Sequence, residues 1–333
     1  MRDGIAIAGN MIVDTVKEID VYPAEGMLSN IGNVQMSVGG CVPNTAIDIK
    51  KIDDTLPVEA LGMVGDDSNG RYLLDALKKN GVDARGVMIN NQAVTSFTDV
   101  MAASGGKTRT FFHARGSNAV MGFDDIDFDQ VQSRFFHIGY ALLLDGFDAP
   151  DPQFGTVMAK TLARAQEKGL KTSMDVVSEN SDRFSAIVTP SLRYCDNVII
   201  NEVEASMICR LAVRQDDVLD KEALLAVCRK LMDAGVRENV VIHAPEAACA
   251  LTNEGEFVFV PSLKLPSGYI KGTVGAGDAF CAGVLYAFYR GCCVEEALLI
   301  GAGAAASSLS EINSIDGMKN LEHIRGLIKQ YRA

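Results

Sequence analysis

The segment Gly272-Thr273-Val274-Gly275-Ala276-Gly277-Asp278-Ala279-Phe280 decides how the rest of the chain is interpreted. It follows an extended stretch, Phe257-Pro261, and precedes an apolar helical pattern, Ala282-Tyr289. Its glycines let the backbone approach a ligand closely. A helix that begins here would point free N–H groups and its positive dipole end at the same spot, which suits an anionic phosphoryl group. An isolated acid in a first helical turn can be only a favourable terminal charge, but beside these glycines Asp278 becomes a candidate catalytic group.

The second part of the chain, from about residue 134, alternates short β-branched runs with longer helical patterns. Repeated βαβ units of this kind predict a doubly wound, mostly parallel sheet with helices on both faces. The expected strands are Phe135-Ile138, Thr172-Val176, Asn197-Ile200 and Val240-His243, and the expected helices are Gln153-Lys168, Asp182-Arg193 and Lys221-Ala234.

The first 115 residues differ, because four extended stretches predict a small sheet that projects as a lid: Met11-Val21, Asn33-Val38, Val94-Met101 and Thr108-Phe112. The last two face each other across Ser104-Gly105-Gly106, as in a hairpin. Strands Ile5-Ala8 and Val58-Val64 and helices Asn44-Ile52 and Asn69-Asn80 would return the chain to the main sheet. We expect one α/β domain, 1–333, with lid strands within about 11–38 and 90–115.

The composition and charge of the chain exclude several classes of function. With 48% hydrophobic and 22% charged residues among 333, the chain is typical of a globular protein. Neither a signal peptide nor a membrane span is visible, and a net charge of −12 without a Lys/Arg block argues against a nucleic-acid surface. The eight cysteines follow no zinc or disulfide spacing. We therefore expect a cytoplasmic protein with small-molecule partners, and no nucleic-acid or membrane partner.

Other familiar motifs are set aside. Gly106-Lys107-Thr108 resembles the end of a phosphate-binding loop, but it lies between two strands and is interpreted as a hairpin turn. Gly301-Ala302-Gly303 fits a dinucleotide fingerprint, yet a helical pattern precedes it and only about thirty residues follow. Close packing of two helices explains it better. The four histidines show no metal-ligand spacing.

Several motifs, in order along residues 4 to 330, resemble those of the ribokinase/PfkB family of carbohydrate kinases. The segment 272–278 is similar to the family's C-terminal signature, D-T-x-G-A-G-D. The other matching motifs are Gly9-Asn10 with Asp14, Gly39-Gly40-x-x-x-Asn44-x-Ala46, Gly62-x-x-Gly65-x-Asp67-x-x-Gly70, Gly81-Val82-Asp83 and Asn201-x-x-Glu204.

The resemblance implies a ribokinase-like fold and ATP-dependent phosphorylation of a hydroxyl on a small sugar or sugar-like substrate, with Mg²⁺. Asp278 would be the general base, and the backbone of Gly275, Ala276 and Gly277 the anion hole. The implied sugar contacts are Asn10, Asp14, Gly39, Gly40 and Asn44. The implied nucleotide contacts are Asn201, Glu204, Thr273, Gly275 and Gly277, with Glu204 holding the metal through water. Relatives also suggest a homodimer that pairs through the lid.

Two departures from the family pattern bear on function. Gly272 replaces an Asp often associated with a monovalent-cation site, so potassium activation is not expected. His243-Ala244-Pro245-Glu246-Ala247-Ala248 replaces a turn with two glycines near the nucleotide phosphates, which predicts altered nucleotide contacts.

The substrate stays open at this stage. A nucleoside kinase of the same fold and a noncatalytic sugar-sensing protein are alternatives, and the sequence names neither the sugar nor the hydroxyl that is phosphorylated. Arg115, at the end of the second lid strand of the hairpin, is either a solvated side chain or a forked donor for a substrate carboxylate or vicinal hydroxyls.

Overall fold

A nine-stranded sheet forms the centre of the computed structural model, which describes residues 2–103, 109–179 and 181–332. All neighbouring strands are parallel except the last two, β16 and β17, each antiparallel to its neighbour. The predicted mostly parallel sheet is therefore confirmed. In spatial order the strands are β17 (Phe257–Pro261), β16 (Ala247–Thr252), β15 (Asn239–His243), β12 (Asn197–Asn201), β11 (Lys171–Val176), β8 (Phe135–Ala141), β1 (Ile5–Gly9), β4 (Val58–Gly65) and β5 (Asp83–Asn90).

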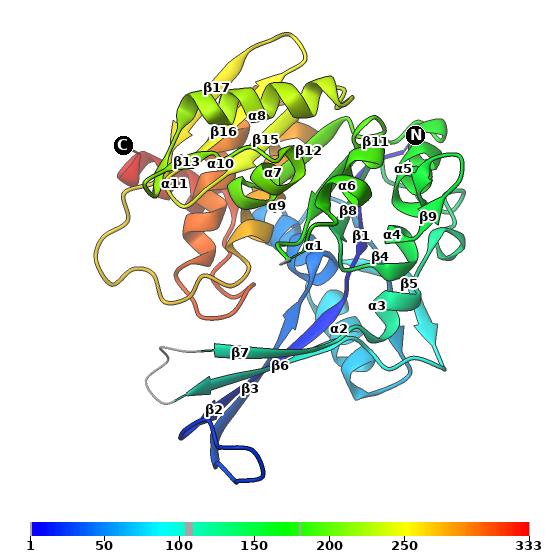
Figure 1. The fold of residues 1–333 in the computed structure, drawn as a ribbon, viewed down its shortest axis with the longest axis vertical. Coiled ribbons are helices and arrows are strands. Elements are labelled where there is room, and N and C mark those ends of the chain that lie inside the picture. The colour runs from blue at the N-terminus through cyan, green and yellow to red at the C-terminus, as the bar shows by residue number, and fades with distance from the viewer. Residues whose placement is uncertain (1, 104–108, 180, 333) are drawn as a thin grey trace.

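Helices cover both faces of this sheet (Figure 1). Side chains of a strand alternate between faces, and in β1 Ile5 and Ile7 join one hydrophobic core whereas Ala6 and Ala8 join the other. The first core includes α1 (Cys41–Ile52), α2 (Ser68–Lys79), α9 (Ala276–Tyr289), α10 (Val294–Ser308) and α11 (Leu321–Tyr331). The second includes α4 (Asp145–Asp148), α5 (Val157–Glu167), α6 (Phe184–Leu192), α7 (Glu202–Cys209) and α8 (Lys221–Asp233), with the 3-10 turn η1 (Phe123–Asp125) before them.

The predicted lid is a separate four-stranded sheet that projects from the body (Figure 1). Its order is β3 (Ile31–Gly39), β2 (Ile12–Ile19), β6 (Phe97–Ala103) and β7 (Arg109–Ala114). β2 pairs parallel with β6, and the two outer pairs are antiparallel. The predicted turn at 104–106 and the motif at 106–108 lie outside the described residues, but the strands on either side pair as a hairpin requires.

One predicted helix begins later than expected. The pattern Gln153-Lys168 indicates a single helix, whereas residues 150–156 form a ribbon of β9 (Pro150–Asp151) and β10 (Gly155–Thr156). Thr156 Oγ1 then caps α5 by accepting a 3.2 Å hydrogen bond from the Ala159 N–H. A second ribbon pairs β13 (Arg214–Gln215) with β14 (Val218–Leu219).

The glycines of the false dinucleotide fingerprint pack helices, as predicted. Gly301 lies inside α10, and a Cβ at Gly283 of α9 would stand 2.9 Å from the Gly301 Cα. Helices α9 and α10 therefore approach backbone to backbone. Among the helices of the described ranges, none combines the length and apolar character that crossing a membrane requires.

Candidate active site

The glycine-rich segment forms the start of α9, where the sequence predicts an anion site. Gly275 is the residue before the helix and adopts φ +79°. A Cβ there would lie 2.5 Å from Ser314 Cβ, so glycine is required by both conformation and space. Gly277 is different, because a Cβ would meet only His243 Cε1, at an ordinary contact distance of 3.5 Å. The fold thus demands glycine at 275 but not at 277.

Asp278 lies in the first turn of α9 and is only 7% exposed. Its Oδ1 accepts a 2.5 Å hydrogen bond from the Tyr140 hydroxyl, and its Oδ2 accepts a 2.8 Å bond from Asn44 Nδ2. Burial raises the pKa of Asp278, and the hydrogen bonds from Tyr140 and Asn44 oppose that rise. The carboxyl is therefore a desolvated group held in one orientation, as a general base requires.

Asn44 faces this carboxyl from α1. It is 3% exposed, and its Oδ1 lies 2.8 Å from Ser314 Oγ. The residue that precedes α1 is Gly40, so Asn44 is not the helix cap. The sequence predicts that Asn44 contacts the sugar, whereas here both ends of its amide are bonded within the protein.

Asp14 on β2 and Gly39 on β3 lie close together where the lid joins the body, although Asp14 pairs with Ser37 and Gly39 with Ile12. A Cβ at Gly39 would stand 2.3 Å from Asp14 Oδ2, so the glycine leaves room for the carboxylate. Burial raises the pKa of Asp14 to about 6; a hydrogen bond with Thr98 lowers it, and the charge of Asp278 raises it further. Gly40 turns the chain from β3 into α1 with φ +85°.

Asn10 does not have a free side chain for a substrate. It is fully buried, its Oδ1 accepts a 2.6 Å bond from the Tyr140 N–H, and its Nδ2 donates to Leu143 O at 3.3 Å. Asn10 therefore positions the backbone that carries Tyr140. The predicted contact between Asn10 and the sugar stays a prediction.

A cavity of about 280 Å³ opens beside Asp278 at the carboxyl ends of the parallel strands, where ligands bind in folds of this kind. It brings together predicted residues and several that sequence reasoning missed. The lining residues are Tyr140, Asp175, Val176, Val177, Ser178, Ile199, Asn201, Glu204, His243, Gly275, Gly277, Asp278 and Cys281. Thr273 is not among them.

Asn201 and Glu204 begin α7 as a reciprocal capping pair. Asn201 Oδ1 accepts from the Glu204 N–H at 2.8 Å, and Glu204 Oε2 accepts from the Asn201 N–H at 2.9 Å. Glu204 Oε1 also accepts bonds from Ser178 Oγ and Asn201 Nδ2. Burial raises the pKa of Glu204 to about 8, and the hydrogen bonds with Asn201 and Ser178 act in the opposite direction. A buried carboxyl at the cavity wall suits a hydrated divalent cation, and its bonded oxygens favour contact through water.

The structure shows the surroundings of the two departures from the family pattern. A Cβ at Gly272 would lie 2.7 Å from Ile312 O and 2.9 Å from Glu311 O, so the neighbouring loop occupies the space of a side chain. The turn after His243 is a tight hairpin in which the Ala244 N–H donates to Ala247 O. Glu246 in that turn forms a two-pronged ion pair with Arg214, 2.8 Å at each contact.

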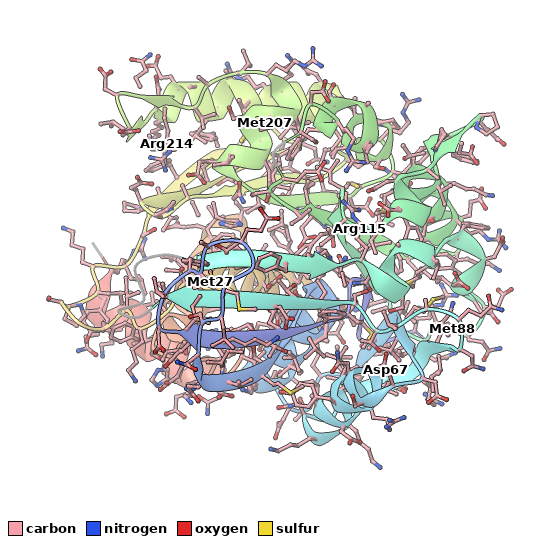
Figure 2. All side chains as sticks on the ribbon, turned by 60° about the horizontal axis from the view of Figure 1, so that its bottom comes forward. Met27, Asp67, Met88, Arg115, Met207 and Arg214 are labelled. Atoms are coloured by element: carbon pink, nitrogen blue, oxygen red, sulfur yellow. The ribbon has the colours of Figure 1, made fainter. Side chains whose placement is uncertain are left out.

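Arg115 precedes the short helix α3 (Gly116–Val120), at the end of the lid that joins the body (Figure 2). Its guanidinium lies 2.5 Å from Asp145 Oδ1 and 4.0 Å from Glu179 Oε2. Two carboxylates of the protein therefore already face the Arg115 guanidinium, for which binding to a substrate was one of the two predicted roles.

Tyr140, Ser178 and His243 are among the cavity residues that were not predicted from the sequence. Each lies at or just beyond the carboxyl end of a strand: β8, β11 and β15. That position is the signal that could have found them, because active sites form at this edge of a parallel sheet. None belongs to a recognisable spacing motif.

Comparisons with known proteins agree with the fold. A family model described as pfkB family carbohydrate kinase matches residues 5–321. A 5-dehydro-2-deoxygluconokinase of Geobacillus thermodenitrificans is 25% identical over 309 residues, 89% of this chain and 85% of the relative. The structure of Arabidopsis thaliana ribokinase complexed with ribose and ATP superposes with a TM-score of 0.81 at 21% identity, covering 99% of each chain. A fructokinase with bound ATP from Xylella fastidiosa gives a TM-score of 0.75 at 18% identity, again covering 99% of each chain.

Proposed function

The chain belongs to the PfkB family of carbohydrate kinases, and from this premise we propose that it transfers the γ-phosphoryl group of ATP to a hydroxyl of a small sugar or sugar-like substrate. One observation carries the proposal: a buried carboxyl, Asp278, stands in the first turn of α9 at the wall of a cavity. The same turn offers backbone N–H groups for an anion, so base and anion site are adjacent.

In the proposed reaction the substrate hydroxyl gives its proton to the Asp278 carboxylate. The oxygen of the substrate hydroxyl forms the new bond to the γ-phosphorus. The bond between the γ-phosphorus and the bridging oxygen of the β-phosphate breaks, and ADP leaves with that electron pair. The N–H groups of Gly275, Ala276 and Gly277 would bind the transferring group's oxygens. Of these three, Gly275 and Gly277 line the cavity.

The hydrogen bond between Tyr140 and Asp278 gives Tyr140 a positioning role. The Tyr140 hydroxyl fixes one oxygen of the base, and Asn10 fixes the Tyr140 backbone. For the other oxygen, Asn44 would have to share Asp278 Oδ2 with the reacting hydroxyl. A carboxylate oxygen has two lone pairs, so it can accept both.

Asn201 and Glu204 are the residues that we propose for Mg²⁺, through its water shell. The ion would neutralise charge on the nucleotide phosphates when bound. Potassium is not expected to activate the enzyme, since the loop at Glu311-Ile312 fills the place of the side chain that is missing at Gly272.

For the sugar we propose contacts from Asp14 and Asn44, with Gly39 leaving room for the Asp14 carboxylate and Gly40 turning the chain into α1. A sugar acid is included in the substrate class because the 5-dehydro-2-deoxygluconokinase relative is named for one. Arg115 would serve such a substrate only by leaving Asp145. An Arg115→Ala variant with a raised KM for sugar acids and an unchanged KM for ATP would support that role.

The experiment that tests the function is a kinase screen. Purified protein with magnesium and ATP is assayed for ADP release against neutral sugars, sugar acids and nucleosides, with Asp278→Asn as the control for contaminating kinases. Turnover of a sugar or sugar acid is expected. Turnover restricted to nucleosides would favour the nucleoside kinase alternative, and none at all with bound sugar would favour the sensing alternative.

We further propose that the lid sheets of two copies pair. Apolar side chains on the outer strands of the lid are largely exposed: Val34 53%, Met36 49%, Phe111 63% and Phe112 57%. Met27 and Leu28 continue this surface onto the loop at the far end of the lid, where Figure 2 shows Met27. Exposed apolar clusters of this kind mark association surfaces.

A further inference from the structure

A cluster of soft and hard donor groups extends inward from the wall of the cavity and takes no part in the proposed phosphoryl transfer. The cluster consists of Cys41 at the start of α1, His137 on β8 and Asp175 at the end of β11. One donor atom from each lies within 4.8 Å of the other two, and all three residues are buried. These residues lie far apart in the sequence, so no spacing motif predicts the cluster.

The donor atoms of the cluster lie within 4.8 Å of one another, somewhat wider than the spacing around one bound ion. His137 Nε2 lies 3.5 Å from Asp175 Oδ2, and the thiol of Cys281, on α9, lies 3.7 Å from the same nitrogen. Two donors bound to one zinc ion stand about 3.5 Å apart, given metal–ligand bonds of about 2.0–2.3 Å. Only small side-chain shifts would therefore bring the donors onto one ion.

His137 has the outer partner that metal-binding histidines use. Its Nδ1 lies 2.8 Å from Ser173 Oγ, which fixes the ring and turns Nε2 toward Asp175. The His137 ring is fully buried, so this orientation is maintained by its surroundings.

Asp175 supplies an independent observation. Among the described residues, its Oδ1 is one of the few buried side-chain oxygens without a hydrogen-bond partner. Its residue is 7% exposed. A buried carboxylate oxygen without a donor is costly unless a cation compensates it. Gly139 leaves room for this oxygen beside Cys41, since a Cβ at Gly139 would lie 1.8 Å from Asp175 Oδ1 and 2.9 Å from Cys41 Sγ.

We propose that this cluster is a binding site for a zinc-class divalent metal, with three protein ligands: Cys41, His137 and Asp175. The mixture of thiolate, imidazole and carboxylate selects zinc or cobalt over magnesium. Asp175 and Cys281 line the cavity, which gives the ion a path and leaves the fourth position to a water or to the Cys281 thiol. On coordination the Cys41 thiol loses its proton to the buffer.

The test measures metal binding and does not depend on kinase activity. The full chain carrying Cys292→Ser and Cys293→Ser is used, because those adjacent cysteines are the most exposed thiols and form a competing site. Under reducing conditions the protein is freed of metal by a chelator and titrated with Co²⁺ and then Zn²⁺. We expect one equivalent bound, intense thiolate-to-cobalt absorption, and a rise in melting temperature with zinc.

Variants assign the site. Cys41→Ser and Asp175→Asn should each weaken zinc binding by about 100-fold or more, beyond the 10–100-fold typical of losing a second-shell partner. The matched control is Cys195→Ser, which removes another buried thiol, bonded to Ser191 O. Circular dichroism checks that each variant folds. Absence of stoichiometric binding in the parent protein, or equal binding by Cys41→Ser, Asp175→Asn and Cys195→Ser, would overturn the proposal.

Discussion

Asn44 Nδ2 donates a 2.8 Å hydrogen bond to Asp278 Oδ2, so an amide expected among the sugar contacts lies directly on the proposed base. Asn44 belongs to α1 and Asp278 to α9, two helices that pack on the same face of the sheet. The contact therefore joins a residue proposed for the sugar to the proposed base.

Replacing Asp278 by Asn removes the proton acceptor and keeps the shape of the side chain. We expect kcat to fall by roughly 10²–10⁴, the usual contribution of a positioned base. Sugar and ATP affinity, measured by calorimetry, should stay within a few-fold of the parent protein. Turnover near that of the parent would show that Asp278 is not the base.

The Tyr140→Phe variant removes one of the hydrogen bonds that oppose the effect of burial on Asp278. The pKa of Asp278 should therefore rise further, and the acid limb of the kcat/KM profile should move to higher pH. The value of kcat/KM should change less at pH values above the acid limb than at the lower pH values where the limb falls. Tyr331→Phe, on the last helix, is the control. A limb that stays in place or moves to lower pH would contradict the role of Tyr140.

Gly275 and Gly277 should respond differently to the same substitution. Gly277→Ala adds a Cβ that meets only His243 at 3.5 Å, so the protein should fold normally. The added group would stand beside the anion site, and kcat should fall by about 100-fold, as when one oxyanion donor is lost.

Gly275→Ala instead forces a side chain into φ +79° and against Ser314. Thermal unfolding should show a loss of at least about 1–2 kcal/mol. Equal stability and equal activity for the two variants would show that this segment is an ordinary turn.

How far the sequence predicted the molecule depends on the range of the interactions. The β1 and β8 strands and the lid were predictable because their signals are local: alternation, β-branched runs and turn glycines. The start of α5 was misplaced by four residues, although Gly155 and Thr156 are poor helix formers; these two residues form β10 of the ribbon, and the helix begins at Val157.

The site was predictable where it rests on motifs, as at Gly275 and Asp278. It was not predictable for Tyr140, whose role depends on Asn10 from β1 and Asp278 from α9. Such a role arises only when the sheet order brings three distant segments together.

Asp14 offers a test in which stability and function change in opposite directions. Its folded-state pKa of about 6 is above the ordinary value of 3.8, so its ionised form is disfavoured in the folded protein. The loss of folding stability caused by ionised Asp14 is absent below about pH 4 and complete above about pH 7. Asp14→Asn should therefore be more stable than the parent at pH 8, by roughly 1–2 kcal/mol after allowance for solvent screening, and no more stable at pH 4.

The same Asp14→Asn variant should raise the KM for the sugar more than the KM for ATP. Chemical denaturation at both pH values and steady-state kinetics at pH 8 make the comparison, with the exposed carboxyl Asp124, changed to Asn, as control. A variant that is less stable than the parent at pH 8 would contradict this account of Asp14.

The lid should carry the subunit contact. Val34 and Met36 lie two residues apart on β3, so their side chains share one face of the lid, and about half of each is exposed. A Val34→Glu/Met36→Glu variant would place two charges on each copy of that face, where they must lose water or repel on pairing. Light scattering at micromolar concentration should give a dimer for the parent protein and a monomer for the variant. Met207→Glu is the matched control, since Met207 is a 38% exposed apolar residue on α7, away from the lid in Figure 2. A variant that remains dimeric would show that the contact lies elsewhere. A parent protein that is monomeric at these concentrations would show that the lid forms no such contact.

If the lid also closes over the sugar, the monomeric variant should show a raised KM for sugar, because a lid without its partner orders at a greater entropic cost.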